Sequence, residues 1–445
     1  MVTKITRIIK AVCFMVIFCL LFGKVTDILY PLDATYKTYD SYYDLEENTV
    51  DMIFLGTSCT YNAWVVPQIW SEAGISAFTL ASSAQPFGMN VELIENALKT
   101  QSPKYIVMDL HGFKSEGYNY DESRTRPIID NFSFLTRLKY VDSIIKDAKE
   151  HAEQTGKDLS LDNSDFSYYL PIIKYHTRWK DGIVQENFEG DPNKYLGYFN
   201  VVGSKQIEKT VVTSETTDLE DYQIDALNKI MNFGKENEDI TLIFTCMPSK
   251  LDKDDQMEIN AAIEILQANG YDVINMNTDE MYQTMGIDFD KDLRDKNHLN
   301  IFGAEKSTKY LVEYLKSNYE IEDHRGDSKY DAWDKASATF DKEYPNIIYR
   351  QLRKIKLNRI EFKSDEVIRV VWNRVYCADG YVIYKKDPIS GEWNEFARVE
   401  DSLINYVDDK LEAGTEAAYT VCAYKMVNGS VAYGAYDQTG ITATR

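Results

Sequence analysis

Short apolar runs alternate with amphipathic stretches between about residues 50 and 320, and this alternation is the strongest structural signal in the chain. The runs have the β-branched and aromatic character of buried strands and fall at 52–55, 77–80, 105–108, 240–244 and 271–275. Amphipathic helical patterns lie between them, and two of these stop at Gly234 and at Asn269-Gly270. The pattern predicts a parallel sheet with helices on both faces. The carboxyl ends of its strands would share one rim, where ligands bind in such sheets.

Two regions depart from this rhythm. Residues from about 115 to 215 lack a strand pattern, which predicts an insertion on the rim that forms a lid or a substrate wall. In it, His176, Arg178 and Trp179 are typical of a sugar or acyl site, although ordinary packing and surface residues of a helix give the same pattern. From Val367 onwards the pattern alternates with period two, which predicts a small all-β sandwich.

The N-terminal segment is apolar and preceded by basic residues. Residues 8–29 are long enough to cross a bilayer of about 30 Å, and no small-residue cleavage site follows them. We expect an uncleaved signal-anchor, with a cleaved signal peptide as the alternative. The preceding basic residues favour a cytoplasmic N-terminus and an extracytoplasmic remainder.

These patterns divide the chain into four parts. We expect a transmembrane anchor with its flank at 1–32, a catalytic domain at 33–340, a charged linker at 341–357 and the β-sandwich at 358–445.

Charge and composition limit the kinds of molecule that the protein can bind. The net charge of -22 argues against nucleic acid or an anionic membrane surface, which would both repel the chain, and favours neutral glycans or small esters. The six cysteines form no CxxC motif and only five histidines occur, so neither a disulfide framework nor a metal site or other cofactor is expected.

Candidate chemistry begins at Gly56-Thr-Ser58, directly after the first predicted strand. Alone, this serine is equally typical of a helix N-cap. Far downstream, Asp295-Lys-Asn-His298 places an acid and an imidazole three residues apart before the last helix of the sheet region. A serine becomes nucleophilic when a histidine within hydrogen-bond reach takes its proton and a carboxylate orients that histidine. We therefore predict a Ser58–His298–Asp295 triad.

These two motifs resemble the first and last blocks of the SGNH/GDSL hydrolase superfamily, over roughly residues 50 to 320. The resemblance implies a flavodoxin-like α/β/α sandwich and acyl-ester chemistry. The wider pattern around Ser58, with a late Asp323-His-Arg-x-x-x-x-Tyr-x-x-Trp333, is similar to membrane-anchored bacterial surface members associated with O-acylation of polysaccharides. That likeness implies a cell-surface glycan substrate and a multi-spanning membrane acyltransferase as partner.

The oxyanion hole is the point of departure from that family. No Gly-x-Asn-Asp follows the third strand, where Asp109-Leu-His111-Gly112 stands instead. The loop after the second strand offers Ser83 and the Gln85 amide. Cys59 and Asn62 adjoin the serine as further oxyanion or substrate candidates, and the Cys59 thiol is an alternative nucleophile.

Residues from about 355 to 445 resemble a fibronectin type III module, through Val371-Trp372, Gly380-Tyr381 and Tyr419-Thr-Val421. The expected function is an extracytoplasmic serine esterase or O-acyltransferase that acts on acyl (acetyl) groups of surface polysaccharide. The alternative is a non-catalytic surface protein with a degenerate hydrolase fold and a module that binds glycan or protein.

Overall fold

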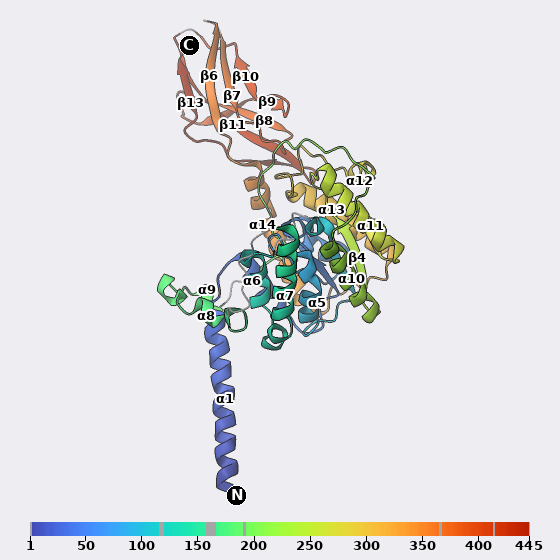
Figure 1. The fold of residues 1–445 in the computed structure, drawn as a ribbon. Helices are drawn as coiled ribbons and strands as arrows, with labels where there is room; N and C mark the ends of the chain where they lie inside the picture. Colours follow the sequence, from blue (N-terminus) through green and yellow to red (C-terminus); the bar gives the residue numbers. More distant parts are fainter. Residues whose placement is uncertain are drawn as a thin grey trace.

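The computed structural model describes residues 2–114, 120–156, 166–189, 193–364, 367–412 and 414–444. Helix α1 (Val2–Leu29) is a single rod that projects from the rest of the molecule (Figure 1). Its stretch Ile5–Leu29 has a mean hydropathy of 2.4, and its buried residues, Thr26 and Leu29, lie at the end that meets the body. The helix is therefore long and apolar enough to cross a membrane, as the sequence predicted.

A parallel five-stranded sheet forms the centre of the body, which confirms the strand pattern read from the sequence. Its order is β2-β1-β3-β4-β5, one of the two common orders of doubly wound sheets. The strands are β1 (Met52–Leu55), β2 (Ala77–Thr79), β3 (Tyr105–Asp109), β4 (Thr241–Cys246) and β5 (Asp272–Asn275). Because nearly every residue of β1 to β4 is buried, these strands read as continuous apolar runs.

Two groups of helices cover the sheet. One group comprises α3 (Ser58–Ala63), α4 (Val66–Ala73), α13 (Ile301–Asn318) and α14 (Asp331–Leu352), which pack on one another. The other comprises α5 (Asn90–Ala97), α10 (Asp221–Glu236) and α11 (Lys253–Ala268). The short helices α2 (Ala34–Tyr43) and α12 (Asp279–Met285) complete the body.

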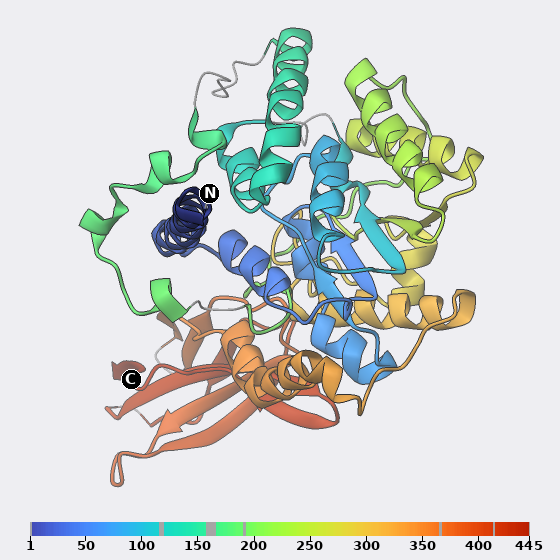
Figure 2. The same ribbon diagram turned by 90° about the horizontal axis from the view of Figure 1, so that it is seen from below.

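The region predicted as a rim insertion divides into separate parts. Helices α6 (Glu122–Asp130) and α7 (Phe134–Thr155) lie on the body, and α8 (Ile172–Tyr175) and α9 (Glu186–Glu189) lie beside the end of α1 (Figures 1 and 2). Only the extended part follows the rim, where the Phe199 N–H donates to the Tyr61 carbonyl and the Lys205 N–H to the Leu293 carbonyl.

Most of the expected linker 341–357 is helical and belongs to α14. Its Ile347, Ile348 and Leu352 are fully or almost fully buried, so the stretch is part of the core. The charged positions that suggested a linker occupy the opposite face of the helix.

The C-terminal module consists of two antiparallel sheets, β10-β7-β6 and β12-β11-β8-β9, with β13 paired to β11. Its strands are β6 (Leu357–Ser364), β7 (Val367–Trp372), β8 (Gly380–Lys386), β9 (Trp393–Glu400), β10 (Asn405–Asp408), β11 (Glu416–Val427), β12 (Ser430–Tyr433) and β13 (Ile441–Thr444). The predicted all-β layout is thereby confirmed.

The module is held against the body by short polar contacts. At the end of α14, just before the chain enters the module, the Gln351 amide exchanges two hydrogen bonds with the backbone of Gly203 in the rim segment, at 2.8 and 2.9 Å. The Cys377 N–H donates to Ser204 Oγ at 3.1 Å, and Lys291 pairs with Asp401 at 2.9 Å. The module therefore adjoins the same part of the rim that carries the 288–300 loop.

The late motif that begins at Asp323 lies at the amino ends of the strands. His324 Nε2 is 2.5 Å from the carboxylate of Asp51, which directly precedes β1, and its ring stacks on Tyr330 with the centroids 4.0 Å apart. The Trp333 indole N–H donates to the Ala77 carbonyl at the start of β2. This motif fastens α14 to the amino edge of the sheet.

Candidate active site

A tight turn carries Ser58 from β1 into α3. Gly56 has φ +151°, and a Cβ at this position would stand 2.1 Å from Thr60 Oγ1 and 3.0 Å from Asp109 Cβ. Glycine is therefore required here by space as well as by conformation. Thr57 is the N-cap, and its hydroxyl accepts from the Cys59 N–H. The serine is consequently the first residue of the helix rather than its cap, which leaves its hydroxyl free for another role.

The three residues of the predicted triad meet at the rim. His298 Nε2 lies 2.8 Å from Ser58 Oγ, and His298 Nδ1 lies 2.8 Å from Asp295 Oδ1. Serine and histidine come from segments 240 residues apart. Both distances are within the range for a nucleophile, a base and an orienting acid.

The loop that holds Asp295 and His298 is closed by its own backbone. The Arg294 N–H donates to the His298 carbonyl at 2.9 Å, and Leu293 and Leu299 form an isolated antiparallel bridge. Asp295 Oδ1 also accepts from the N–H groups of Asn297 and His298 at 3.0 and 3.1 Å. The carboxylate thus fixes both the loop and the imidazole.

The environment of Asp295 keeps it ionised. Burial alone would raise the pKa of this carboxyl, but the His298 ring and the two backbone N–H groups outweigh it and hold the pKa at about 2. The side chains of His298 and Asp295 are 21% and 30% exposed, so the triad opens to solvent.

The buried carboxyl of Asp109, at the end of β3, stabilises the turn that carries Ser58. It accepts from the Thr60 hydroxyl at 3.2 Å and from the Met247 N–H at 3.3 Å, and so ties α3 to the ends of β3 and β4. Burial raises the pKa of Asp109 to about 7, against the hydrogen bonds donated by the backbone of His111 and Met247. Sequence reasoning did not assign Asp109 a role, although an acid that ends an otherwise apolar strand was an available signal.

His111 and Gly112 form the turn that directly follows β3. A Cβ on Gly112 would lie 2.9 Å from Thr57 Cγ2 and 3.2 Å from the Gln85 carbonyl, so this turn packs directly against the nucleophile turn. His111 is 7% exposed, and its Nδ1 has no hydrogen-bond partner among the described residues. Burial, with smaller contributions from Lys114 and His298, lowers the pKa of His111 to about 3. The imidazole is therefore neutral and carries one N–H donor.

The remaining rim candidates have structural partners. Gln85 is buried and bonds Ser82 and Asn90 through its side chain, so its amide is already engaged. Asn62 is buried and donates to the Phe199 carbonyl at 2.6 Å, which holds the extended segment on the rim. Ser83 Oγ is 3.1 Å from Tyr61 Oη at an exposed position. Of these three, only Ser83 has its polar group at the surface.

Cys59 is buried, and its side chain is directed at the loop that carries His298. Its Sγ contacts the Asn297 carbonyl at 3.1 Å, and burial raises the pKa of the thiol well above its ordinary value. A neutral thiol in this position serves as a packing residue that also contacts the Asp295 loop.

His176 and Arg178 contact their own segment and the end of α1, so their role as substrate residues stays a prediction. His176 is exposed, and its Nδ1 is 2.8 Å from the Ile173 carbonyl. Arg178 donates to the Leu29 carbonyl at 2.7 Å, at the end of α1. A cation is favourable at a helix C-terminus, so this contact gives the arginine a structural role.

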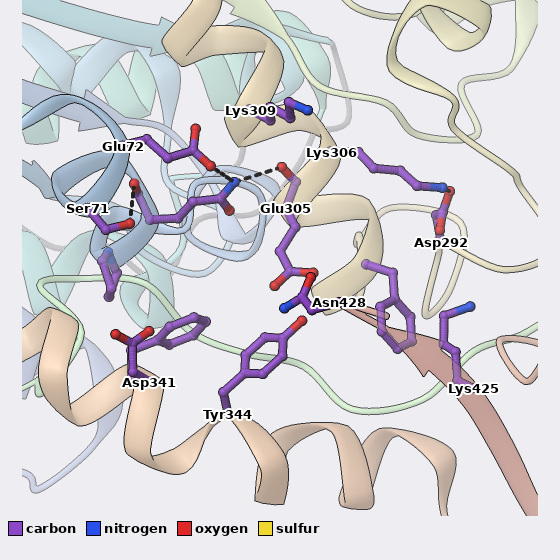
Figure 3. A pocket seen from close by; sticks show the side chains of 14 residues that line it. Ser71, Glu72, Asp292, Glu305, Lys306, Lys309, Asp341, Tyr344, Lys425 and Asn428 are labelled. Carbon is purple, nitrogen blue, oxygen red and sulfur yellow. Dashed lines mark hydrogen bonds and ion pairs between the residues drawn. The ribbon is translucent and has the colours of Figure 1, made fainter. Parts of the chain in front are cut away.

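A separate groove of about 520 Å³ lies between α4, α13, α14 and the tip of β11. Figure 3 shows that Glu305, Lys306, Tyr344 and Lys425 project into it, with Asp341 on its border. Burial raises the pKa of Glu305 to about 7, against its hydrogen bond from Tyr344. The groove contains none of the triad residues and is a junction between the body and the module.

Comparison with known proteins adds little to this description. No protein-family model matches the chain, and no curated protein matches it. Solved structures that resemble it include "FN3tt mut" (15% identity, 21% of this chain, 93% of that chain, TM-score 0.16). An Fn3-like protein from Clostridium thermocellum has 23% identity over 18% of this chain and 82% of its own, with a TM-score of 0.16. An FN3 domain of human collagen XX has 21% identity over 19% and 85%, with a TM-score of 0.15.

These similarities concern the fold of about a fifth of the chain and carry no information on activity. The resemblance to SGNH hydrolases rests on the sequence motifs alone.

Proposed function

We propose that this protein is an extracytoplasmic serine enzyme of the SGNH type, anchored by α1, that hydrolyses or transfers acyl groups on cell-surface polysaccharide. The observation that carries the proposal is the continuous chain of 2.8 Å contacts from Asp295 through His298 to Ser58 at the rim of a doubly wound sheet. Two His-acid contacts occur in the described part of the chain at this closeness, and this is the one that reaches a hydroxyl nucleophile.

The reaction proceeds in two half-reactions. Ser58 Oγ attacks the ester carbonyl while His298 Nε2 takes its proton, and the resulting imidazolium is stabilised by Asp295. The tetrahedral intermediate then expels the alcohol, which receives that proton from His298, and Ser58 is left acylated. In the second half, His298 deprotonates water or a glycan hydroxyl, which attacks the acyl carbon. The bond between that carbon and Ser58 Oγ then breaks, Ser58 takes the proton back from His298, and the acid or the acylated glycan is released.

The oxyanion that forms in each half needs donors. The Ser58 N–H is at the first position of α3 and has no acceptor within its own helix. The neutral His111 imidazole adds a second donor on the adjacent turn, in the place where the family has an asparagine.

An exposed rim favours a large substrate over a small enclosed ester. The triad side chains are partly open to solvent, and the C-terminal module adjoins the 288–300 loop through Lys291 and Asp401. A polymer could therefore lie across the rim and the module together. The net charge of -22 favours neutral glycans, and a multi-spanning acyltransferase is the kind of partner that would supply an activated acyl group from across the membrane.

A fluorophosphonate probe tests the nucleophile directly in the full-length protein. We expect labelling of the wild type, loss of labelling in Ser58→Ala and in His298→Ala, and unchanged labelling in Ser143→Ala, which changes an exposed serine on α7. An intact wild-type protein that takes no label, together with unchanged glycan acylation in a deletion strain, would support a non-catalytic surface protein instead.

Mass spectrometry of surface glycans in the deletion strain separates the two reactions. Loss of acyl groups identifies a transferase, and gain of acyl groups identifies an esterase.

A further inference from the structure

Large apolar side chains are exposed around the end of α1. They belong to the segment 166–188 and to the first turns of α7, and together they are called the collar below. Figure 2, a view along α1, shows this segment in green curving beside the dark blue helix. The exposed members, between 37% and 73% accessible, are Phe134, Leu135, Leu138, Phe166, Leu170, Ile173, Trp179, Ile183, Val184 and Phe188.

The collar is fixed to the end of α1 by specific contacts. Arg178 and Asn187 donate to the carbonyls of Leu29 and Ile28, at 2.7 and 3.1 Å. On the α7 side, Arg137 Nη1 is 3.4 Å from the Tyr30 hydroxyl, which in turn donates to the Asp130 carbonyl. The exposed apolar surface is therefore continuous with the point where the apolar helix enters the body.

The charge of the collar differs from that of the whole chain. Its segment 166–188 contains three basic residues, Lys174, Arg178 and Lys180, and two acidic ones, Asp181 and Glu186, in a protein of net charge -22. Lys174 pairs with Glu122 at 2.7 Å. Lys180 lies over the Trp179 ring, 5.7 Å from its centroid, and Trp179 is 60% exposed. Apolar side chains with a tryptophan and flanking lysines are the combination that settles at the boundary between headgroups and acyl chains.

We propose that the collar lies in the interfacial layer of a phospholipid bilayer that α1 spans. Its apolar side chains enter the acyl boundary, and Lys180, beside Trp179, remains at the level of the lipid phosphates. The collar then fixes the tilt of the body on the membrane, with the module and the adjoining catalytic rim at the far end from α1 (Figure 1). This inference rests on the membrane location in the proposed function but does not depend on acyl chemistry.

Site-directed spin labelling of the full-length protein in nanodiscs tests the proposal. Cys13 and Cys19 are exposed on α1, whereas Cys59, Cys246, Cys377 and Cys422 are buried, so a background with Cys13→Ser and Cys19→Ser labels only at introduced sites. Labels enter through Leu135→Cys, Trp179→Cys and Phe188→Cys. The matched control is Ile389→Cys, which changes an equally apolar residue, 96% exposed, in the β8–β9 turn.

We expect the three collar labels to be relaxed by oxygen, which dissolves in the bilayer, and to be protected from a water-soluble nickel complex. The label at 389 should be fully accessible to nickel. Anionic lipid should deepen the label at 179 relative to a purely zwitterionic bilayer. Equal depth in both would overturn the part assigned to Lys180. If the collar labels are as accessible to nickel as the control, the proposal is overturned. Because no partner protein is present in the nanodisc, the exposed surface would then be assigned to a protein partner. Fluorophosphonate labelling of the same samples reports separately on Ser58.

Discussion

The sheet carries a histidine-aspartate pair at each end of strand β1, and the two pairs differ in what surrounds them. At the carboxyl end, His298 and Asp295 contact Ser58 and are partly open to solvent. At the amino end, His324 and Asp51 are 2.5 Å apart, the histidine side chain is 9% exposed, and a tyrosine ring covers it. The same two residue types thus contact a serine hydroxyl at one edge and form a structural clamp at the other.

Removal of the Ser58 hydroxyl at the carboxyl end of β1 should have the largest effect on activity. Ser58→Ala is expected to lower acyl-transfer or esterase turnover by about 10⁴-fold or more, since residues of such a triad act as a unit. The melting temperature should stay within a degree or two of the wild type, because the hydroxyl caps nothing in α3. Steady-state kinetics and calorimetry on the same preparation check both expectations. Residual turnover within tenfold of the wild type would contradict the role of Ser58.

His111 provides the next test, since it places a neutral donor beside the nucleophile. His111→Ala should lower turnover by about 10²-fold with little change in KM, as expected for a donor that acts on the transition state. His111→Asn restores an N–H donor of the type the SGNH family uses and should recover much of that loss. A purely structural role would instead lower the melting temperature of both variants and leave turnover per folded molecule unchanged.

The amino-end pair should respond in the opposite manner. His324→Ala leaves the Asp51 carboxylate without its partner and removes the stacking on Tyr330, so it should destabilise the fold by about 2–3 kcal/mol. Turnover per folded molecule should remain at the wild-type level, because Ser58 and His298 lie at the other end of β1. Denaturant unfolding, combined with active-site titration, separates the two quantities. A loss of turnover without a loss of stability would contradict the clamp.

The smallest effect concerns the pH dependence of stability at Asp295. Its pKa of about 2 in the folded protein lies below the ordinary value of 3.8, so its contribution is fully present above about pH 4 and is lost as the pH falls towards 2. The difference in unfolding free energy between the wild type and Asp295→Asn should therefore shrink from pH 5 to pH 2.5. A difference that is constant over this range would show that the carboxylate is not held by His298 and the loop.

The sheet could be predicted closely because burial alone determines its strands. The expected runs at 52–55, 77–80 and 271–275 match β1, β2 and β5 to within a residue at each end. The proximity of Ser58, Asp295 and His298 followed from the rule that the strand ends of a parallel sheet share one rim. No comparable rule exists for the collar, because the partner of Arg178 is a carbonyl 149 residues away at the end of a helix.

Two other features escaped the sequence for related reasons. The environment of His111 is formed by Thr57 and Gln85, which lie on two other turns, so its burial is invisible in its own segment. The 341–357 stretch was interpreted from its charge, whereas its apolar residues recur with helical spacing and belong to the core through Ile347, Ile348 and Leu352. Net polarity concealed the periodicity.

The packed junction between α14, through Gln351, and Gly203 of the rim segment determines the distance between the module and Ser58. A flexible linker would give the module a broad distribution of separations from Ser58, with an effective concentration that falls as the linker lengthens. Here the packed contacts fix the module at one distance from Ser58 and in one orientation relative to the rim. Lengthening this junction would change the reach of the molecule and leave its chemistry intact.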